Sequence, residues 1–431
     1  MFSALTAVRN GRLASARPWG NMKPLRSSFR SAAALALVGA APVFAVAACN
    51  AAPSGADAPL PSPTDAGAPV DGARNAADGG APKADGEAPP DGAAAGALFG
   101  FVGAGDGKIR VYDVSDTTGA WSLKRESNVG GHPSFLAFDP SRRRVVATDE
   151  SGGLVRSFAF DPATGALSAV NERSAGGAGT THVSFDPAGT WVMVANYTGG
   201  NMSILPIDAA GVLGPPADTK ASGEKSHWAG TNPSGTHVFV PALGTDAVSQ
   251  YILDGSTGKL TSNGVAPVPK GAGPRHLAFH PSEKWAYLIN ELAISVTAMD
   301  FDKASGKLTA KGTTSALPAG QGAAGVSGAE IALHPSGKFV YASTRGYNSI
   351  AAFHVASTDG ALTLVANVPT GGDRPRSFAI DPGGTLLFAA NQVAAAIVGF
   401  RIDSASGALT PLGNVVPSVP SPTFVGLARI P

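Results

Sequence analysis

Charged and imidazole side chains stand at fixed offsets from a repeated turn motif with the pattern Asp/Asn/His-Pro-x-Gly. Five residues before the motif, three copies carry His227, Arg275 and Arg376. One residue later, three copies carry His182, His276 and Glu330. Eleven residues after the motif, the copies carry Glu150, Tyr197, Glu291, Arg345 and Gln392. Equal offsets within a repeat mean equivalent positions, so these residues are expected to form one set.

These residue types together could bind an anion and move a proton. Arginine presents a planar fork of N–H donors that matches a carboxylate or a phosphate. A carboxylate and an imidazole beside such a fork could act as acid and base. Any single member of the set is more simply explained as a solvated charge at the end of a strand. Only the convergence of the whole set predicts a site.

The elements that would position this set are short strands. The turn motif begins at residues 139, 186, 232, 280, 334 and 381, which gives spacings of 47, 46, 48, 54 and 47. Asp or Asn first, Pro second and Gly fourth is typical of a type I turn. An alternating apolar run follows each turn, for example residues 191–196, and two further strand-like runs complete the repeat.

Four strands in each repeat predict the blade of a β-propeller, and residues 96–431 accommodate seven such blades. Residues 422–427 lie 47 positions after the similar residues 375–380, but no second strand follows them. Residues 98–102 and 108–113 resemble the missing partners. We therefore expect an all-β, seven-bladed propeller of four antiparallel strands per blade, in which the N- and C-terminal strands share one blade. A β-helix or an open solenoid is the alternative.

The repeat also predicts where the charged set lies. The start of the first strand and the end of the second lie at the same end of an antiparallel pair. Because the first strand of a blade lines the central channel, the set is expected at one mouth of that channel.

A different composition precedes the propeller. Lys23, Arg26 and Arg30 come before an uncharged apolar run at residues 32–48, which is the layout of a signal peptide, with translation predicted to start at Met22. The run ends in Val-Ala-Ala before Cys49 and resembles the bacterial lipobox, which implies residues 1–48 as signal peptide and lipidation at Cys49. The alternative is an ordinary secretory signal. Residues 49–95 are rich in Ala, Pro, Gly and Asp and are predicted to be a disordered tether.

Composition excludes several classes of function. With 32 Lys and Arg against 31 Asp and Glu, the chain lacks the basic footprint of a nucleic-acid-binding protein. A single cysteine excludes an internal disulfide. The sequence shows no metal-ligand pattern, and no cofactor is expected. We predict an exported protein in the periplasm or at the cell surface, which contacts the membrane only through its N-terminal lipid.

Three segments carry a resemblance to a known family: residues 271–281 (GAGPRHLAFHP), 287–292 (YLINEL) and 344–350 (TRGYNSI). They resemble the seven-bladed propeller lactonases, which include 6-phosphogluconolactonase and carboxymuconate lactonising enzyme. The resemblance implies a site of His227, Arg275, Glu291 and Arg345. Two departures, at Ser226-His227-Trp228 and at Ala242, leave the substrate open. Export predicts a lactone other than a phosphorylated intracellular one.

The resulting hypothesis is a lactonase that hydrolyses a sugar-type or acidic lactone. Glu291 or His227 would be the base, and Arg275 and Arg345 would hold an acidic group or the oxyanion. Further substrate contacts are expected from His182, His276, Asn290, Glu330 and Arg376. The first alternative is a non-catalytic surface propeller that binds a partner or a carbohydrate. The second is a cycloisomerase that forms or opens a lactone.

Overall fold

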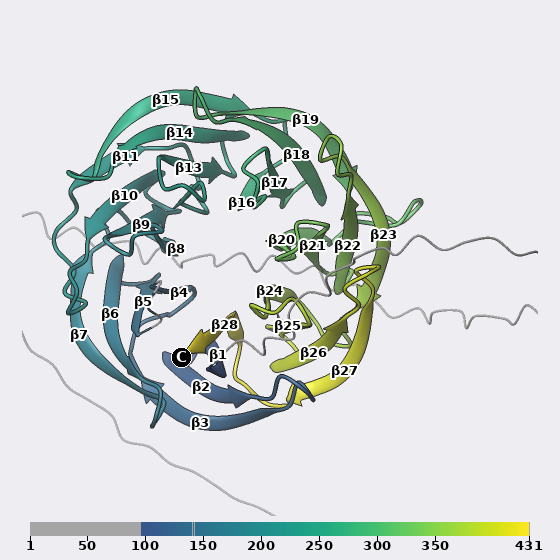
Figure 1. The fold of residues 1–431 in the computed structure, drawn as a ribbon, viewed down its shortest axis with the longest axis horizontal. Coiled ribbons are helices and arrows are strands. Elements are labelled where there is room, and N and C mark those ends of the chain that lie inside the picture. The colour runs from purple at the N-terminus through teal and green to yellow at the C-terminus, as the bar shows by residue number, and fades with distance from the viewer. Residues whose placement is uncertain (1–95, 140, 142, 431) are drawn as a thin grey trace, which may run out of the picture. The chain divides into compact units, whose positions relative to one another are not determined.

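Seven antiparallel sheets of four strands surround a common centre in the computed structural model, which describes residues 96–430 except 140 and 142 (Figure 1). The described residues contain no helix, and therefore none that is long and apolar enough to cross a membrane. The predicted all-β, seven-bladed propeller is confirmed. The predicted signal peptide, the lipidation site at Cys49 and the tether to residue 95 lie outside the described residues.

We number the blades along the chain. Blade 1 contains β4 (Leu136–Phe138), β5 (Arg144–Asp149), β6 (Leu154–Asp161) and β7 (Ala166–Ser174). Blade 2 contains β8 (Thr180–Phe185), β9 (Trp191–Asn196), β10 (Asn201–Pro206) and β11 (Asp218–Ala221). Blade 3 contains β12 (Gly230–Thr231), β13 (His237–Ala242), β14 (Ala247–Asp254) and β15 (Lys259–Pro267).

The remaining blades follow the same order from centre to periphery. Blade 4 contains β16 (Pro274–Phe279), β17 (Trp285–Asn290), β18 (Ser295–Asp302) and β19 (Lys307–Ser315). Blade 5 contains β20 (Ser327–Leu333), β21 (Phe339–Arg345), β22 (Ser349–Val355) and β23 (Leu362–Pro369). Blade 6 contains β24 (Pro375–Ile380), β25 (Leu386–Asn391), β26 (Ala396–Ile402) and β27 (Leu409–Val416). Blade 7 contains β28 (Pro422–Ile430), β1 (Ala97–Ala104), β2 (Lys108–Val114) and β3 (Trp121–Asn128).

The turn motif joins the first and second strands of a blade as its sequence predicts. Asp186 Oδ1 accepts hydrogen bonds from the backbone N–H groups of Thr190 and Trp191, both at 2.7 Å. Asp381 makes the equivalent bonds to Thr385 and Leu386. Gly189 has a φ of 69°, a left-handed conformation that glycine adopts without steric cost. The side chain at the first position therefore caps the turn, and the glycine lets the chain reverse.

The ring is closed by the two ends of the propeller. In blade 7, β28 pairs with β1 in an antiparallel register that runs from Ala97↔Ile430 to Gly103↔Phe424. Figure 1 shows the yellow C-terminal strand beside the dark blue β1. The predicted sharing of one blade by the terminal strands is confirmed, and it removes the free edge that β1 would otherwise expose.

Apolar packing lies between the blades. The described residues contain seven clusters of buried apolar side chains, and each cluster draws from two neighbouring blades. Phe101 of blade 7, for example, packs its ring 4.5 Å from Phe138 and 5.1 Å from Phe160, both of blade 1. The propeller is therefore stabilised by seven similar interfaces arranged in a ring.

Several innermost strands carry one extra residue near the same end. Pro274 pairs with Asn290 and His276 pairs with Ile289, so Arg275 lies in a β-bulge. Equivalent bulges occur at Thr181, at Ala329 and Glu330, and at Arg376. A β-bulge interrupts the alternation of side chains and redirects them. Consecutive residues at these positions can therefore both face the centre.

We expect Phe101→Ala to destabilise the closing interface. The Phe101 side chain is fully buried, and such truncations cost about 3–5 kcal/mol because a cavity remains. Leu123→Ala in the same blade is the matched control, because Leu123 is 59% exposed and its loss should change stability by less than about 0.5 kcal/mol. Equilibrium unfolding in guanidinium chloride measures both. Equal shifts in the two variants would contradict the interface described here.

Candidate active site

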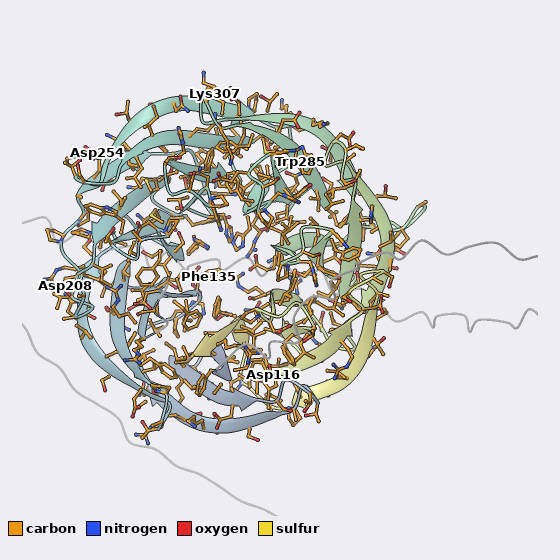
Figure 2. All side chains as sticks on the ribbon, in the orientation of Figure 1. Asp116, Phe135, Asp208, Asp254, Trp285 and Lys307 are labelled. Carbon is orange, nitrogen blue, oxygen red and sulfur yellow. The ribbon has the colours of Figure 1, made fainter. Side chains whose placement is uncertain are left out.

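A hollow opens where the innermost strands carry their bulges. Five predicted site residues line it: His227, Arg275, His276, Glu330 and Arg376. The space enclosed in it is about 10 Å³, which is room for about one water molecule. Figure 2 shows Phe135, another lining residue, near the centre of the ring, while Asp208, Asp254 and Lys307 lie at its periphery.

Five further lining residues were missed in the sequence: Ser134, Phe135, Thr181, Ser377 and Thr423. Four of them occupy the same two offsets from the turn motif, in blades 1, 2 and 6, and Thr423 lies in blade 7, 47 residues after Arg376. The hydroxyl groups of the four Ser and Thr residues make hydrogen bonds within the propeller, for example Ser134 with Thr148 at 3.1 Å. The offset rule could have found all five, but only titratable residues were selected from it. The hollow thus has a charged side and a hydroxyl-lined side.

Two histidines and a glutamate form a hydrogen-bonded file in the hollow. Nδ1 of His227 lies 3.2 Å from Nε2 of His276, and Nδ1 of His276 lies 2.7 Å from Oε1 of Glu330. Glu330 Oε1 also accepts a hydrogen bond from the backbone N–H of Ile331 at 3.0 Å. All three side chains are buried. Nε2 of His227 makes no hydrogen bond with the described residues and is left to the hollow.

Burial sets the protonation of this file. It lowers the pKa of His227 and of His276 well below 6.5, and the positive charge of Arg275 lowers both further. Burial raises the pKa of Glu330 to about 7, against the opposing charge of Arg275. Both imidazoles are therefore neutral at neutral pH, where a ring nitrogen can accept a proton.

Glu291 has a different environment, because two arginines hold it. Its Oε2 lies 3.1 Å from Nε of Arg275, and its Oε1 lies 2.9 Å from Nη2 of Arg345. Burial acts to raise the pKa of Glu291, but the charges of Arg345 and Arg275 lower it overall. The two arginines also donate to the carbonyl groups of Ala329 and Gly328, in and beside the β20 bulge. Glu291 is thus a fixed counter-ion.

Arg376 is the least constrained cation of the set. It is half-buried, lines the hollow, and makes no hydrogen bond or ion pair with the part of the chain that the structure describes. Its charge acts on the pKa values of His227 and Glu330, which places it in the same electrostatic environment. An arginine in this state can bind an anionic group without first breaking a pair.

Four predicted residues do not line the hollow: Glu291, described above, and Arg345, His182 and Asn290. Arg345 lies behind Glu291, and its guanidinium pairs with that carboxylate and with Gly328. His182 packs its ring 4.2 Å from Phe135 and 5.4 Å from Trp228, and burial lowers its pKa well below 6.5. The Asn290 side chain is fully buried and donates to Ser295 and Thr297. The substrate contact from Asn290 stays a prediction; in the structure its amide makes hydrogen bonds within its own blade.

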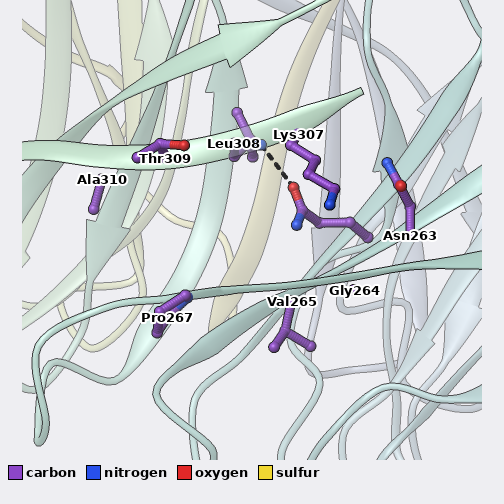
Figure 3. A pocket seen from close by; sticks show the side chains of 9 residues that line it. Asn263, Gly264, Val265, Pro267, Lys307, Leu308, Thr309 and Ala310 are labelled. Atoms are coloured by element: carbon purple, nitrogen blue, oxygen red, sulfur yellow. Dashed lines mark hydrogen bonds between the residues drawn. The ribbon is translucent and has the colours of Figure 1, made fainter. Parts of the chain in front are cut away.

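Larger grooves lie on the outer side of the ring. One is formed between β15 and β19 around Asn263, Val265 and Lys307, where Gln250 accepts a hydrogen bond from the N–H of Leu308 at 2.7 Å (Figure 3). A similar groove lies between blades 7 and 1. Both grooves lie between the outer strands of neighbouring blades, and the first contains a single titratable residue. We therefore interpret them as gaps between blades and not as active sites. No group of three His, Cys, Asp or Glu residues within 96–430 is arranged to hold a metal ion.

Comparison with known proteins assigns the chain to a family. The family model described as "Lactonase, 7-bladed beta-propeller" matches residues 97–427. The chain belongs to this lactonase family. The resemblance expected from residues 271–281, 287–292 and 344–350 is confirmed.

Related proteins carry consistent names. A 6-phosphogluconolactonase of Bacillus subtilis is 32% identical over 260 residues, which cover 58% of this chain and 74% of the relative. A 6-phosphogluconolactonase of Formosa agariphila is 31% identical and covers 63% of this chain and 81% of the relative. The structure of a periplasmic gluconolactonase of Pseudomonas aeruginosa superimposes with a TM-score of 0.72 and 29% identity, over 78% of this chain and all of that chain. The chain is therefore a 6-phosphogluconolactonase-like lactone hydrolase.

The position of Glu291 in this lactonase predicts a structural penalty for its removal. Glu291→Gln keeps the side-chain volume but leaves Arg275 and Arg345 as buried charges without their counter-ion, which costs about 3–5 kcal/mol. Thermal and denaturant unfolding measure this loss. Asp300→Asn is the control, because Asp300 makes a solvent-exposed ion pair with Lys311 worth about 1 kcal/mol or less. Stability as high in Glu291→Gln as in the control would contradict the counter-ion role.

Proposed function

We propose that the chain hydrolyses an unphosphorylated sugar lactone at the open side of the hollow, with His227 as general base and Arg376 as the group that stabilises the oxyanion. One observation carries this proposal. The file of His227, His276 and Glu330 ends at a ring nitrogen that has no hydrogen-bond partner within the described part of the chain. The hollow also contains Arg376, which is unpaired within the same described part. Base and cation are the two groups that ester hydrolysis near neutral pH requires.

The chemistry follows from the roles of these two groups. Nε2 of His227 takes a proton from water, and the resulting hydroxide forms a bond to the lactone carbonyl carbon. Negative charge develops on the carbonyl oxygen, where the guanidinium of Arg376 stabilises it. The ring C–O bond then breaks, and the ring oxygen receives the proton back. The product is a hydroxy acid, which ionises in water.

The surroundings of the two candidate bases favour His227 over Glu291. The sequence left this choice open. Glu291 is paired with Arg275 and Arg345, which lower its pKa and so reduce its ability to accept a proton. His227 is neutral, and one of its ring nitrogens has no hydrogen-bond partner among the described residues.

Several observations support a small sugar lactone as substrate. The hydroxyl groups of Ser134, Thr181, Ser377 and Thr423 line one side of the hollow and suit a polyhydroxylated ligand. The similar periplasmic protein of Pseudomonas aeruginosa is named a gluconolactonase. A phosphorylated lactone would compete with the oxyanion for Arg376, the one arginine lining the hollow that has no partner among residues 96–430 as described.

We further propose that the protein is exported and is anchored by a lipid on Cys49. The basic residues before the apolar run at 32–48 and the lipobox-like end of that run support this. The periplasmic location given in the name of the similar gluconolactonase supports export.

Activity tests the catalytic proposal. With glucono-δ-lactone in a pH-stat, we expect His227→Gln to lower kcat/KM about 10²- to 10⁴-fold, the usual contribution of a general base. Arg376→Gln should lower it about 10²- to 10³-fold, the usual effect of losing an oxyanion donor. Arg401→Gln is the control, because Arg401 lies on β26 of the same blade and donates to Thr117 near the surface.

The outcomes separate the alternatives. Faster turnover of 6-phosphoglucono-δ-lactone would overturn the substrate class but keep the site. No turnover of either lactone would favour the binding propeller. Formation or opening of a lactone without uptake of water, seen by product analysis in ¹⁸O-labelled water, would indicate the cycloisomerase.

The anchor is tested separately from catalysis. Cys49→Ser should abolish incorporation of labelled palmitate and move the protein from the membrane fraction to the soluble one, because the anchoring thiol is lost. A wild-type protein without label would indicate an ordinary secretory signal.

A further inference from the structure

The file of His227, His276 and Glu330 contains more groups than a general base requires. His276 uses both ring nitrogens, one toward His227 at 3.2 Å and one toward Glu330 at 2.7 Å. His276 is only 3% exposed, and Glu330 is 8% exposed. A buried imidazole with both nitrogens engaged must donate at one and accept at the other when it is neutral. The direction of donation along the file is therefore fixed by one of its ends.

The carboxylate end decides that direction. An ionised Glu330 can only accept, so Nδ1 of His276 carries the proton and Nε2 of His276 accepts. Nδ1 of His227 must then donate, and Nε2 of His227 holds the lone pair that faces the hollow. A protonated Glu330 that donates to Nδ1 of His276 reverses every bond, and Nε2 of His227 then carries a hydrogen.

We propose that Glu330 is the positioning residue that fixes the tautomer of His227 through His276 and is the final acceptor of the proton taken from water. This inference rests on the proposed role of His227 as general base. It gives Glu330 a different role from the substrate contact that the sequence suggested.

Proton transfer along the file balances without a separated charge. Water loses a proton to Nε2 of His227, Nδ1 of His227 passes its proton to Nε2 of His276, and Nδ1 of His276 passes its proton to Oε1 of Glu330. The file becomes neutral, and the negative charge moves to the hydroxide and then to the oxyanion beside Arg376. The reverse sequence returns one proton to the ring oxygen as the C–O bond breaks. No imidazolium has to form next to Arg275 and Arg376.

The environment of Glu330 suits a proton acceptor better than that of Glu291. The groups that face Glu330 are His276, His182, the N–H of Ile331 and the charges of Arg275 and Arg376, and neither arginine forms an ion pair with it. Burial raises the pKa of Glu330 to about 7, so transfer to it at neutral pH is nearly balanced. Glu291, fixed by two arginines, has a lowered pKa and no bond to either histidine of the file.

The first test is the pH dependence of hydrolysis. Glu330 must be ionised to accept, so kcat/KM of the wild-type full chain with glucono-δ-lactone should fall as the pH drops through about 7. Glu330→Gln should lower kcat about 10²- to 10⁴-fold, as loss of the carboxylate partner of a histidine base does, with little change in KM. The fall of kcat/KM near pH 7 should be absent in this variant. Glu330→Asp should recover part of kcat. A raised KM with unchanged kcat would indicate substrate contact and overturn the proposal.

A matched control distinguishes the effect of removing Glu330 from the file from the effect of removing any buried carboxylate. Glu283 in blade 4 is also buried and bonded, to Asn232, Ser234 and Lys303, but has no contact with the file. Glu283→Gln is expected to lose stability and keep the wild-type pH profile. If Glu283→Gln also lost the fall of kcat/KM near pH 7, that fall could not be assigned to Glu330.

The second test needs no substrate. ¹⁵N chemical shifts of the His227 ring report which of its nitrogens carries hydrogen. The His227 signals are assigned as those that disappear in His227→Gln. We expect hydrogen on Nδ1 at pH 8.5 and on Nε2 at pH 5.5, with the change centred near 7 and absent in Glu330→Gln. A tautomer that is independent of pH and of Glu330 would overturn the file. A tautomer change in a protein that hydrolyses no lactone would instead overturn the proposed function alone.

Discussion

One extra residue in the innermost strands is the constraint on which the site depends. A regular strand sends successive side chains to opposite faces, so only one of two neighbours could reach the centre of the ring. The bulges at Arg275, Ala329 and Glu330, and Arg376 remove that restriction. Neighbours such as Arg275 and His276 then line the same hollow. The β20 bulge also leaves the carbonyl groups of Gly328 and Ala329 free to accept from the two arginines behind Glu291.

Two buried glutamates have different environments, and only Glu330 lines the hollow. Glu291 lies between two arginines and is kept ionised, whereas Glu330 lies against an imidazole and a backbone N–H and has a pKa raised to about 7. Environment, and not residue type, separates a counter-ion from a proton acceptor. Such a group of buried charges is costly to assemble, and the seven apolar interfaces between blades provide the rigid surroundings that keep its members paired.

The repeat made much of this predictable. Turn spacing gave the number of blades, the similarity of residues 422–427 to 375–380 gave the closure, and equal offsets brought His227, Arg275, His276, Glu330 and Arg376 to one hollow. The directions of the side chains could not be predicted, because the alternation of apolar residues in the sequence does not reveal a β-bulge. Arg345 and Asn290 share the rim but point into the blades. The pairing of Glu291 with arginines, and of Glu330 with His276, depends on contacts between blades, which no offset within one repeat can supply.

The pairing of β28 with β1 has a consequence for biosynthesis. A ribosome delivers β1, β2 and β3 first, but the strand that completes their blade consists of Pro422–Ile430. The inner edge of β1 therefore stays unpaired during nearly all of synthesis and is a template for mispairing or chaperone binding. A chain cut short by even these few residues leaves a blade without its central strand and a ring that cannot close. Closure of the ring thus depends on the strand of the propeller that is synthesised after all the others.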